Sequence, residues 1–179
     1  SAALLPLPIS KAIERVLTQH EQLTDERLSV YAVTSLPKSE LVGLGDAVFE
    51  EWRKEAPRPP DSVVLLVNAD TGELEIRTGL GLDPVLPTSR IAEIRKTFFR
   101  PEWRAGRKTR AVVLSLVEVL RTLDSPLISS GEAVDTFERA GFTGGWMPAS
   151  PERKPWTGWL LALLGIAATA FVLVRTLVG

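Results

Sequence analysis

A long apolar segment near the C-terminus constrains the fold more than any other feature of the chain. Residues 156–178 read WTGWLLALLGIAATAFVLVRTLV, and the stretch from Gly158 to Val174 contains no charged side chain. A helix of this length, rising about 1.5 Å per residue, can just cross a hydrocarbon core of about 30 Å. The alternative is a buried core helix, but no polar stripe interrupts the run. We therefore expect a single transmembrane helix at 156–178.

Four small residues recur along this segment at three- and four-residue steps, a spacing found where helices pack inside membranes. They are Gly158, Ala162, Gly165 and Thr169. Small residues are also common in membrane helices generally, so a specific partner helix is one of two interpretations. Basic residues flank both ends of the segment, and their number does not decide its orientation.

Composition excludes several classes of function. The formal net charge is −1, which gives no bulk electrostatic attraction to nucleic acid. The chain has no cysteine, which excludes disulfides, thiol nucleophiles and cysteine metal sites. The first residues, SAALLPLP, fit the processed end of an export signal, and removal of a methionine before Ser1 would fit equally well.

Hydrophobic periodicity predicts alternating helices and strands before the apolar segment. Helices are expected at 9–23, 39–55, 88–99 and 101–123, and strands at 28–36, 63–69 and 73–78. The run VVLLVNA at 63–69 has the most continuous apolar character, so we expect a central strand covered on both faces. Asp70-Thr71-Gly72 is expected to turn the chain into a hairpin, and Thr88 or Ser89 to cap the helix that follows. This order predicts a layered α/β domain.

The predicted helices and strands divide the chain into four parts. They are an N-terminal tail at 1–8, the α/β domain at 9–123, a tether at 124–155 and the membrane helix at 156–178. The tether contains four prolines and four glycines, with one short helix expected at 131–140. We expect it to become ordered only against a partner, with the aromatic side chains of Phe137, Phe142 and Trp146 lying along that partner.

The order of these features resembles the TPM domain family. The resemblance is carried by VYAVTSL, FEEWRK, DSVVLLVNADTGELEIRTGLGLD and FRPEWRAGRKTRAVVLSLVEVL, and it covers residues 9–123. Family members include thylakoid-lumen proteins of photosystem II repair and bacterial membrane-anchored exported proteins. The resemblance implies a three-layer α/β/α sandwich with a central, mostly parallel sheet. It also implies an inner or photosynthetic membrane, with the domain periplasmic or lumenal and the C-terminus cytoplasmic.

The stretch EIRTGLGLDPVLPTSR holds the candidate site. A dinucleotide fingerprint is excluded, because Pro84 stands where its third glycine would be. Some members of the similar family are acid phosphatases or bind divalent metals through acidic residues, and Asp61 and Asp83 match two of those positions. The third position, within Leu86-Pro87-Thr88, has no carboxylate. Calcium takes six to eight oxygen ligands, so we expect no cofactor and leave Ca²⁺ as an alternative at Asp61 and Asp83.

No catalytic residue is expected. His20 is the only histidine, and we interpret it as a solvated side chain on the surface of the first helix. Phosphatase chemistry would need a nucleophile or a metal-activated water, and neither is evident.

A basic segment is the more distinctive feature. Residues 90–110 carry eight basic side chains against two acidic ones, whereas residues 14–55 carry nine acidic against five basic. Ordinary solvated helix faces explain part of this pattern. The segment could also dock on anionic lipid headgroups or on an acidic partner. The residues expected to bind a partner or lipid are Arg95, Lys96, Arg100, Arg104, Arg107 and Trp146.

These features together predict a membrane-anchored, non-catalytic accessory or assembly subunit of a larger membrane protein complex. The resemblance makes a photosynthetic reaction-centre complex a candidate partner, and membrane lipid is a second one. The alternatives are a divalent-metal-dependent acid phosphatase and a calcium-binding module. Nucleic acid is not expected as a partner.

Overall fold

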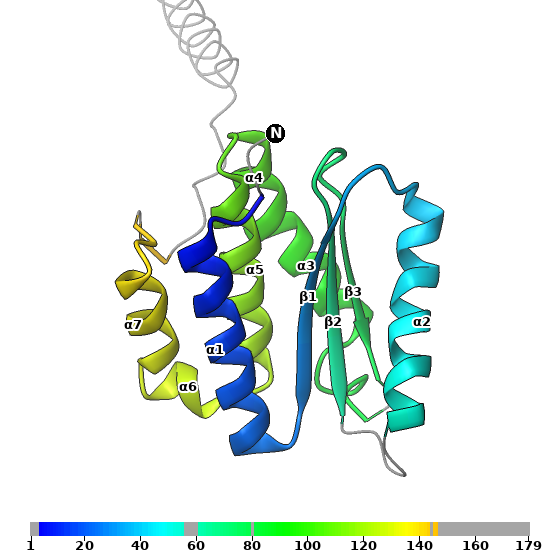
Figure 1. The fold of residues 1–179 in the computed structure, drawn as a ribbon, viewed down its shortest axis with the longest axis horizontal. Coiled ribbons are helices and arrows are strands. Elements are labelled where there is room, and N and C mark those ends of the chain that lie inside the picture. The colour runs from blue at the N-terminus through cyan, green and yellow to red at the C-terminus, as the bar shows by residue number, and fades with distance from the viewer. Residues whose placement is uncertain (1–3, 56–60, 80, 144, 147–179) are drawn as a thin grey trace, which may run out of the picture. The chain divides into compact units, whose positions relative to one another are not determined.

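The computed structural model describes residues 4–55, 61–79, 81–143 and 145–146, which fall within one compact unit, residues 1–149. A three-stranded sheet lies between helices in this unit (Figure 1). The elements are α1 (Leu7–Thr24), β1 (Arg27–Val33), α2 (Lys38–Glu55), β2 (Ser62–Asn68), β3 (Leu74–Thr78), α3 (Thr88–Ile94), η1 (Arg95–Phe99), α4 (Arg100–Arg104), α5 (Lys108–Thr122), α6 (Pro126–Ser129) and α7 (Glu132–Arg139).

The sheet is mixed, with strand order β1-β2-β3. β1 pairs parallel with β2, starting at Arg27 opposite Ser62, and β2 pairs antiparallel with β3, starting at Val63 opposite Thr78. The expected mostly parallel sheet is therefore wrong. The physical reason is the short turn at residues 69–73, because a parallel return would need a crossover of a dozen or more residues.

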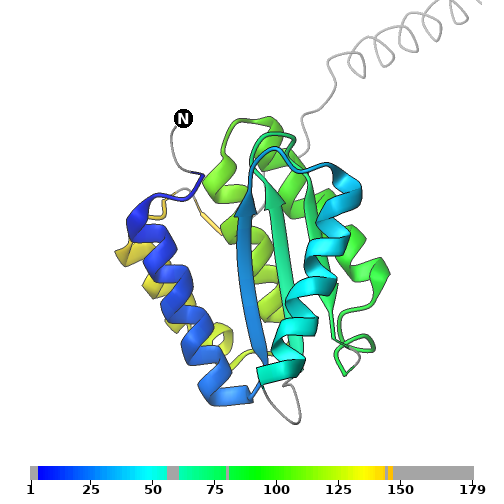
Figure 2. The same cartoon turned by 45° about the vertical axis from the view of Figure 1, so that its right-hand side comes forward.

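β2 is the centre of the domain, as its apolar run predicts. All seven of its residues are buried. Val63, Leu65 and Val67 belong to the main core, whereas Val64 and Leu66 face a smaller cluster with residues of α2. Figures 1 and 2 show α2 alone on one face of the sheet and α1 and α5 on the other, which gives the three expected layers.

The turn between β2 and β3 is built around Asn68, which is fully buried. Its side-chain oxygen accepts hydrogen bonds from the backbone N–H groups of Asp70 and Thr71, at 2.9 and 3.0 Å, and its amide nitrogen donates to the Leu36 carbonyl at 2.6 Å. These bonds fix the hairpin and join it to the loop after β1. The predicted hairpin is confirmed.

The helical region after β3 differs from the sequence expectation in two places. The helix expected over 88–99 continues from α3 into η1, a π-helical turn, and its N-cap position is Pro87 with no side-chain cap from Thr88 or Ser89. The helix expected over 101–123 is interrupted, because Gly106 adopts a φ of 76° between α4 and α5. A left-handed residue at that point cannot continue a right-handed helix.

Residues 124–143 of the segment expected to be a tether are folded against the rest of the domain. Helices α6 and α7 pack on α1 (Figure 1). Phe137 and Phe142 are buried in the main core rather than presented to a partner. The reason is that Ala133 and Phe137 fall on one face of α7, which gives the helix an apolar side for α1.

The predicted membrane helix at 156–178, with Gly158, Ala162, Gly165 and Thr169, lies outside the described residues. Among the helices that are described, none is long and apolar enough to cross a membrane.

Candidate functional site

The glycine-rich stretch after β3 brings Asp61 against the backbone of Gly81. A Cβ atom placed on Gly81 would lie 1.9 Å from Oδ1 of Asp61. A side chain at position 81 would therefore displace the Asp61 carboxylate, and Gly81 does not adopt a positive φ. Gly79 has a different role, since its N–H donates to the Ser62 carbonyl at 2.8 Å and extends the pairing of β3 with β2.

The two expected metal-site carboxylates have different neighbours. Asp83 accepts a short hydrogen bond from the Thr78 hydroxyl, which ties the loop to the end of β3. Asp61 lies close enough to Glu26 to act on its ionisation. Burial raises the pKa of the Glu26 carboxyl, and the Asp61 carboxylate raises this pKa further. Glu26 is thus an acidic neighbour of Asp61 that the sequence did not reveal.

His20 is fully buried, so the expected surface position is wrong. Its Nε2 lies 3.0 Å from Oε2 of Glu26, and its Nδ1 lies 2.9 Å from the hydroxyl oxygen of Ser125. A neutral ring that carries its proton on Nε2 donates to Glu26 and accepts from Ser125, which satisfies both nitrogens. Burial lowers the pKa of His20, so this loss of hydration outweighs the neighbouring carboxylate.

A site for a hard cation such as Ca²⁺ needs several oxygen ligands placed close together. Within the described residues, no group of three or more His, Cys, Asp or Glu side chains is placed to hold a metal ion. Asp61 and Asp83 remain the two positions at which a cation would be sought.

Four of the eight basic side chains of the segment pair with carboxylates, either within the segment or on β3 and α5. Arg107 and Arg110 both contact the fully buried Glu102, at 2.5 and 3.0 Å. Arg95 contacts Glu75 of β3 at 2.8 Å. Arg90 contacts Glu93 within α3 and Glu118 of α5, and the second contact joins the two helices. The segment therefore supports the fold as well as carrying charge.

Five cations of the segment are exposed, and three of these lack a partner among the described residues. Lys96, Arg100 and Arg104 have no hydrogen bond or ion pair with any residue that the structure describes. They recur every four residues along η1 and α4, so they lie on successive turns of one continuous helical rod. Of the residues expected to bind a partner, these three are available, whereas Arg95 and Arg107 hold internal carboxylates.

Trp146 packs on its own domain. Its ring centroid lies 6.1 Å from that of Phe137 and 4.7 Å from that of Phe142, and its Nε1 donates to Glu138 at 3.0 Å. It is half-buried, so one part of the ring stays accessible. Its expected role in partner binding stays a prediction.

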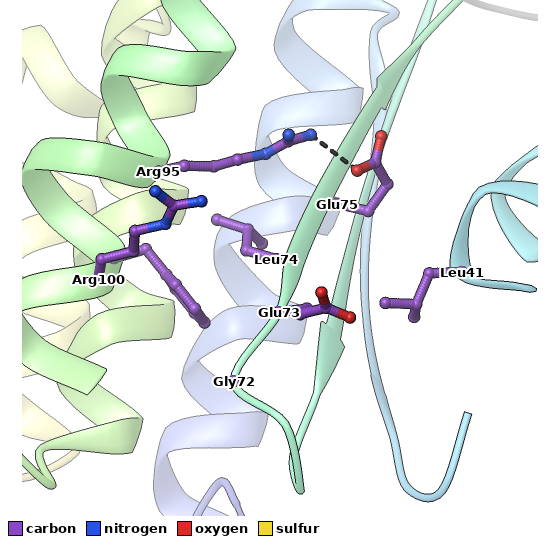
Figure 3. A pocket seen from close by; sticks show the side chains of 8 residues that line it. Leu41, Gly72, Glu73, Leu74, Glu75, Arg95 and Arg100 are labelled. Carbon is purple, nitrogen blue, oxygen red and sulfur yellow. Dashed lines mark hydrogen bonds and ion pairs between the residues drawn. The ribbon is translucent and has the colours of Figure 1, made fainter. Parts of the chain in front are cut away.

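A pocket of about 120 Å³ lies between β3 and the η1–α4 rod. Figure 3 shows Arg95 and Arg100 on one wall and Glu73 and Glu75 on the other. Its lining residues are Leu41, Gly72, Glu73, Leu74, Glu75, Arg95, Phe99 and Arg100. The pocket thus joins guanidinium groups, carboxylates and an apolar floor.

The comparison with known protein families matches residues 1–121 to the TPM domain. This chain belongs to the TPM domain family. Curated proteins gave no match.

Two solved structures share the fold of this TPM domain. One is the solution NMR structure of the N-terminal domain of a protein from P. gingivalis, with a TM-score of 0.60 and 19% identity, covering 69% of this chain and 79% of that one. The other is the NMR structure of the BA42 protein from the psychrophilic bacterium Bizionia argentinensis, with a TM-score of 0.54 and 15% identity. It covers 68% of this chain and 83% of the other. At these identities the likeness concerns the fold alone.

Several contacts of this TPM domain were not predicted from the sequence. The sequence predicted Asp61 and Asp83 as candidate metal ligands, and that role stays a prediction. The sequence missed the contacts of His20 and Glu26, although His20 follows Ile13 and Val16 by seven and four residues and so shares their helix face. It also missed Glu75 as the counter-ion of Arg95, and no local pattern marks a pair 20 residues apart.

Proposed function

We propose that this chain is a membrane-anchored, non-catalytic accessory subunit of a larger membrane protein complex, with its TPM domain as the docking module. One observation carries the proposal: Lys96, Arg100 and Arg104 are exposed and unpaired within the described structure, beside arginines that are paired. Like charges four residues apart on a helix oppose each other by a few tenths of a kcal/mol. An acidic partner would relieve that repulsion and gain attraction from all three.

The surroundings of Asp61, Asp83 and His20 support a non-catalytic role. The carboxylate of Asp83 accepts a hydrogen bond from Thr78, and that of Asp61 lies against Gly81. His20 is fully buried and has a partner at each ring nitrogen, so it is not exposed to a substrate. Each of these groups therefore has a role within the fold.

The membrane part of the proposal rests on the sequence. The uncharged stretch Gly158–Val174 is long enough to cross a bilayer, and Gly158, Ala162, Gly165 and Thr169 could pack against a partner helix. Family resemblance favours a periplasmic or lumenal domain in an inner or photosynthetic membrane. A photosynthetic reaction-centre complex is then one candidate partner.

The test is affinity purification of the full chain in mild detergent, beside a version that ends at Lys154, with mass spectrometry of the bound proteins. We expect one membrane complex with the full chain and much less of it with the shortened version. Recovery of the full chain alone would contradict the proposal. The same preparation, tested for hydrolysis of phosphate esters with and without calcium, examines the phosphatase alternative.

A further inference from the structure

We propose that the pocket between β3 and the η1–α4 rod receives the carboxylate side chain of an acidic segment of the partner. The inference rests on the proposed docking function and names the chemistry of the docked group. Arg100 provides the principal contact, and Arg95 provides a second donor. The exposed Lys96 and Arg104 then lie on the turns before and after the contact, where they attract further acidic residues of the same segment.

The π-helical turn explains why the two arginines share a pocket. Arg95 and Arg100 are five residues apart, and in a regular α-helix they would point about 140° away from each other. In η1 the backbone N–H of Arg100 bonds to the carbonyl of Arg95, which is the i to i+5 pattern of a π-helix. This wider turn brings both side chains to one side of the rod, as Figure 3 shows. Such turns occur frequently at functional sites.

Arg95 spans the edge strand of the sheet. Leu74 is buried toward the main core, whereas Glu75, the next residue of β3, points to the opposite face. The Arg95 side chain reaches past β3 and meets Glu75 at 2.8 Å. Its Nε is buried and has no acceptor. One donor of this guanidinium is therefore unsatisfied, a state that usually costs about 1–3 kcal/mol when the donor is buried.

Arg100 differs from Arg95 because it has no acidic partner among the described residues. Arg100 lines the pocket together with the apolar residues Leu74 and Phe99. A planar guanidinium offers parallel N–H donors that match the two oxygens of a carboxylate. The apolar neighbours would cover the methylene groups of an aspartate or glutamate side chain.

Charge selects a carboxylate rather than a phosphate. Two arginines and two glutamates line the pocket, so their formal charges cancel. A ligand with one negative charge gains from Arg100 at little repulsion from Glu73 and Glu75. A phosphate monoester carries close to two charges, so each lining carboxylate repels it more strongly than it repels a carboxylate side chain. An acidic side chain is therefore the expected occupant.

The experiment is a titration of the full chain in mild detergent, followed by NMR of the arginine Nε–Hε signals. The probe is a blocked five-residue alanine peptide with a central glutamate, and its control has glutamine instead. We expect saturable shifts of the Arg95 and Arg100 signals with the glutamate peptide only. Arg100→Ala should raise the Kd at least about tenfold, which corresponds to about 1.4 kcal/mol. Arg100 is exposed, so this variant should fold normally.

Matched variants distinguish binding of the glutamate in the pocket from general attraction to exposed positive charge. Arg104→Ala should raise the Kd only about twofold, as for exposed charges in general. Equal effects of Arg100→Ala and Arg104→Ala would overturn the inference, as would the absence of shifts with the glutamate peptide. Stronger shifts with inorganic phosphate, or with vesicles rich in phosphatidylserine, would also overturn it. The peptide titration needs no native partner, so it can fail while co-purification of a complex succeeds.

Discussion

The ring of His20 on α1 lies 2.9 Å from the hydroxyl oxygen of Ser125, a residue 105 positions later in the chain. Ser125 directly precedes α6, so the contact joins α1 to the start of α6. Glu26, at the start of β1, completes the arrangement at the other ring nitrogen. The side chain of His20, which is buried and titratable, thus joins α1 to the residues that precede β1 and α6.

This contact makes stability depend on pH. Burial lowers the pKa of His20 from its usual 6.5, so below that pH the unfolded chain takes up a proton before the folded chain does. The free energy of unfolding of the native chain should therefore fall, relative to that of His20→Gln, as the pH drops below 6.5. Urea unfolding of both proteins between about pH 8 and pH 5 measures this difference.

Glu26 acts in the opposite sense. Its pKa is raised by burial and by Asp61, so its contribution to stability decreases as the pH rises above the usual 4.5. The comparison with His20→Gln is needed for that reason, because it isolates the histidine. A constant difference between the two proteins over the whole range would show that His20 does not titrate differently on folding.

Glu102 links α4 to α5 across the interruption at Gly106. Its fully buried carboxylate contacts Arg107 and Arg110, which stand on the far side of Gly106. Glu102→Ala should lower the free energy of unfolding by about 3–5 kcal/mol, because Arg110 is left largely buried without this carboxylate. The matched control is Glu93→Ala, which removes an exposed partner of Arg90 and should cost at most about 1 kcal/mol. Similar losses in chemical denaturation would contradict the assignment.

Gly72 is required by the ring of Trp103. A Cβ atom on Gly72 would lie 1.9 Å from Nε1 of that ring, and the φ of Gly72 is 71°. Gly131 has a similar φ of 80° but open space around it. Gly131→Ala should therefore cost about 1–2 kcal/mol for backbone strain alone. Gly72→Ala should cost clearly more in thermal unfolding, and equal costs would show that Trp103 moves aside freely.

Asp61 and Gly81 should be coupled energetically. Gly81→Ala places a methyl group against the Asp61 carboxylate, so it should destabilise the domain. In an Asp61→Ala background the same substitution should cost less, by about 0.5–3 kcal/mol. A double-mutant cycle in denaturant measures this coupling. Additive effects would show that the loop adapts without regard to Asp61.

Much of the fold could be read from local patterns. The continuous apolar run of β2 located the centre of the sheet, because a strand covered on both faces needs apolar residues at every position. The hairpin turn followed from the polar residues and glycine after Asn68. The interruption at Gly106 was missed, since a single glycine is tolerated in many helices and its conformation depends on tertiary contacts.

The candidate site was less predictable than the fold. The pairing of Glu75 with Arg95 depends on how η1 lies along the edge of β3, and no spacing rule reports that placement. The π-helical turn is also set by tertiary packing. His20 was an error of another kind, because its position in phase with Val16 was visible in the sequence. A polar residue on an apolar face can be buried when partners from distant segments satisfy it.

The central claim is that an exposed basic face of the TPM domain recruits a membrane complex. The most direct test is co-purification in mild detergent of the full chain, Lys96→Glu/Arg100→Glu and the control Lys11→Glu/Arg15→Glu. Both variants reverse one exposed lysine and one exposed arginine four residues apart, so their net charges are equal. We predict that only the first variant loses the complex. Equal retention by all three proteins, or equal loss in both variants, would contradict the account.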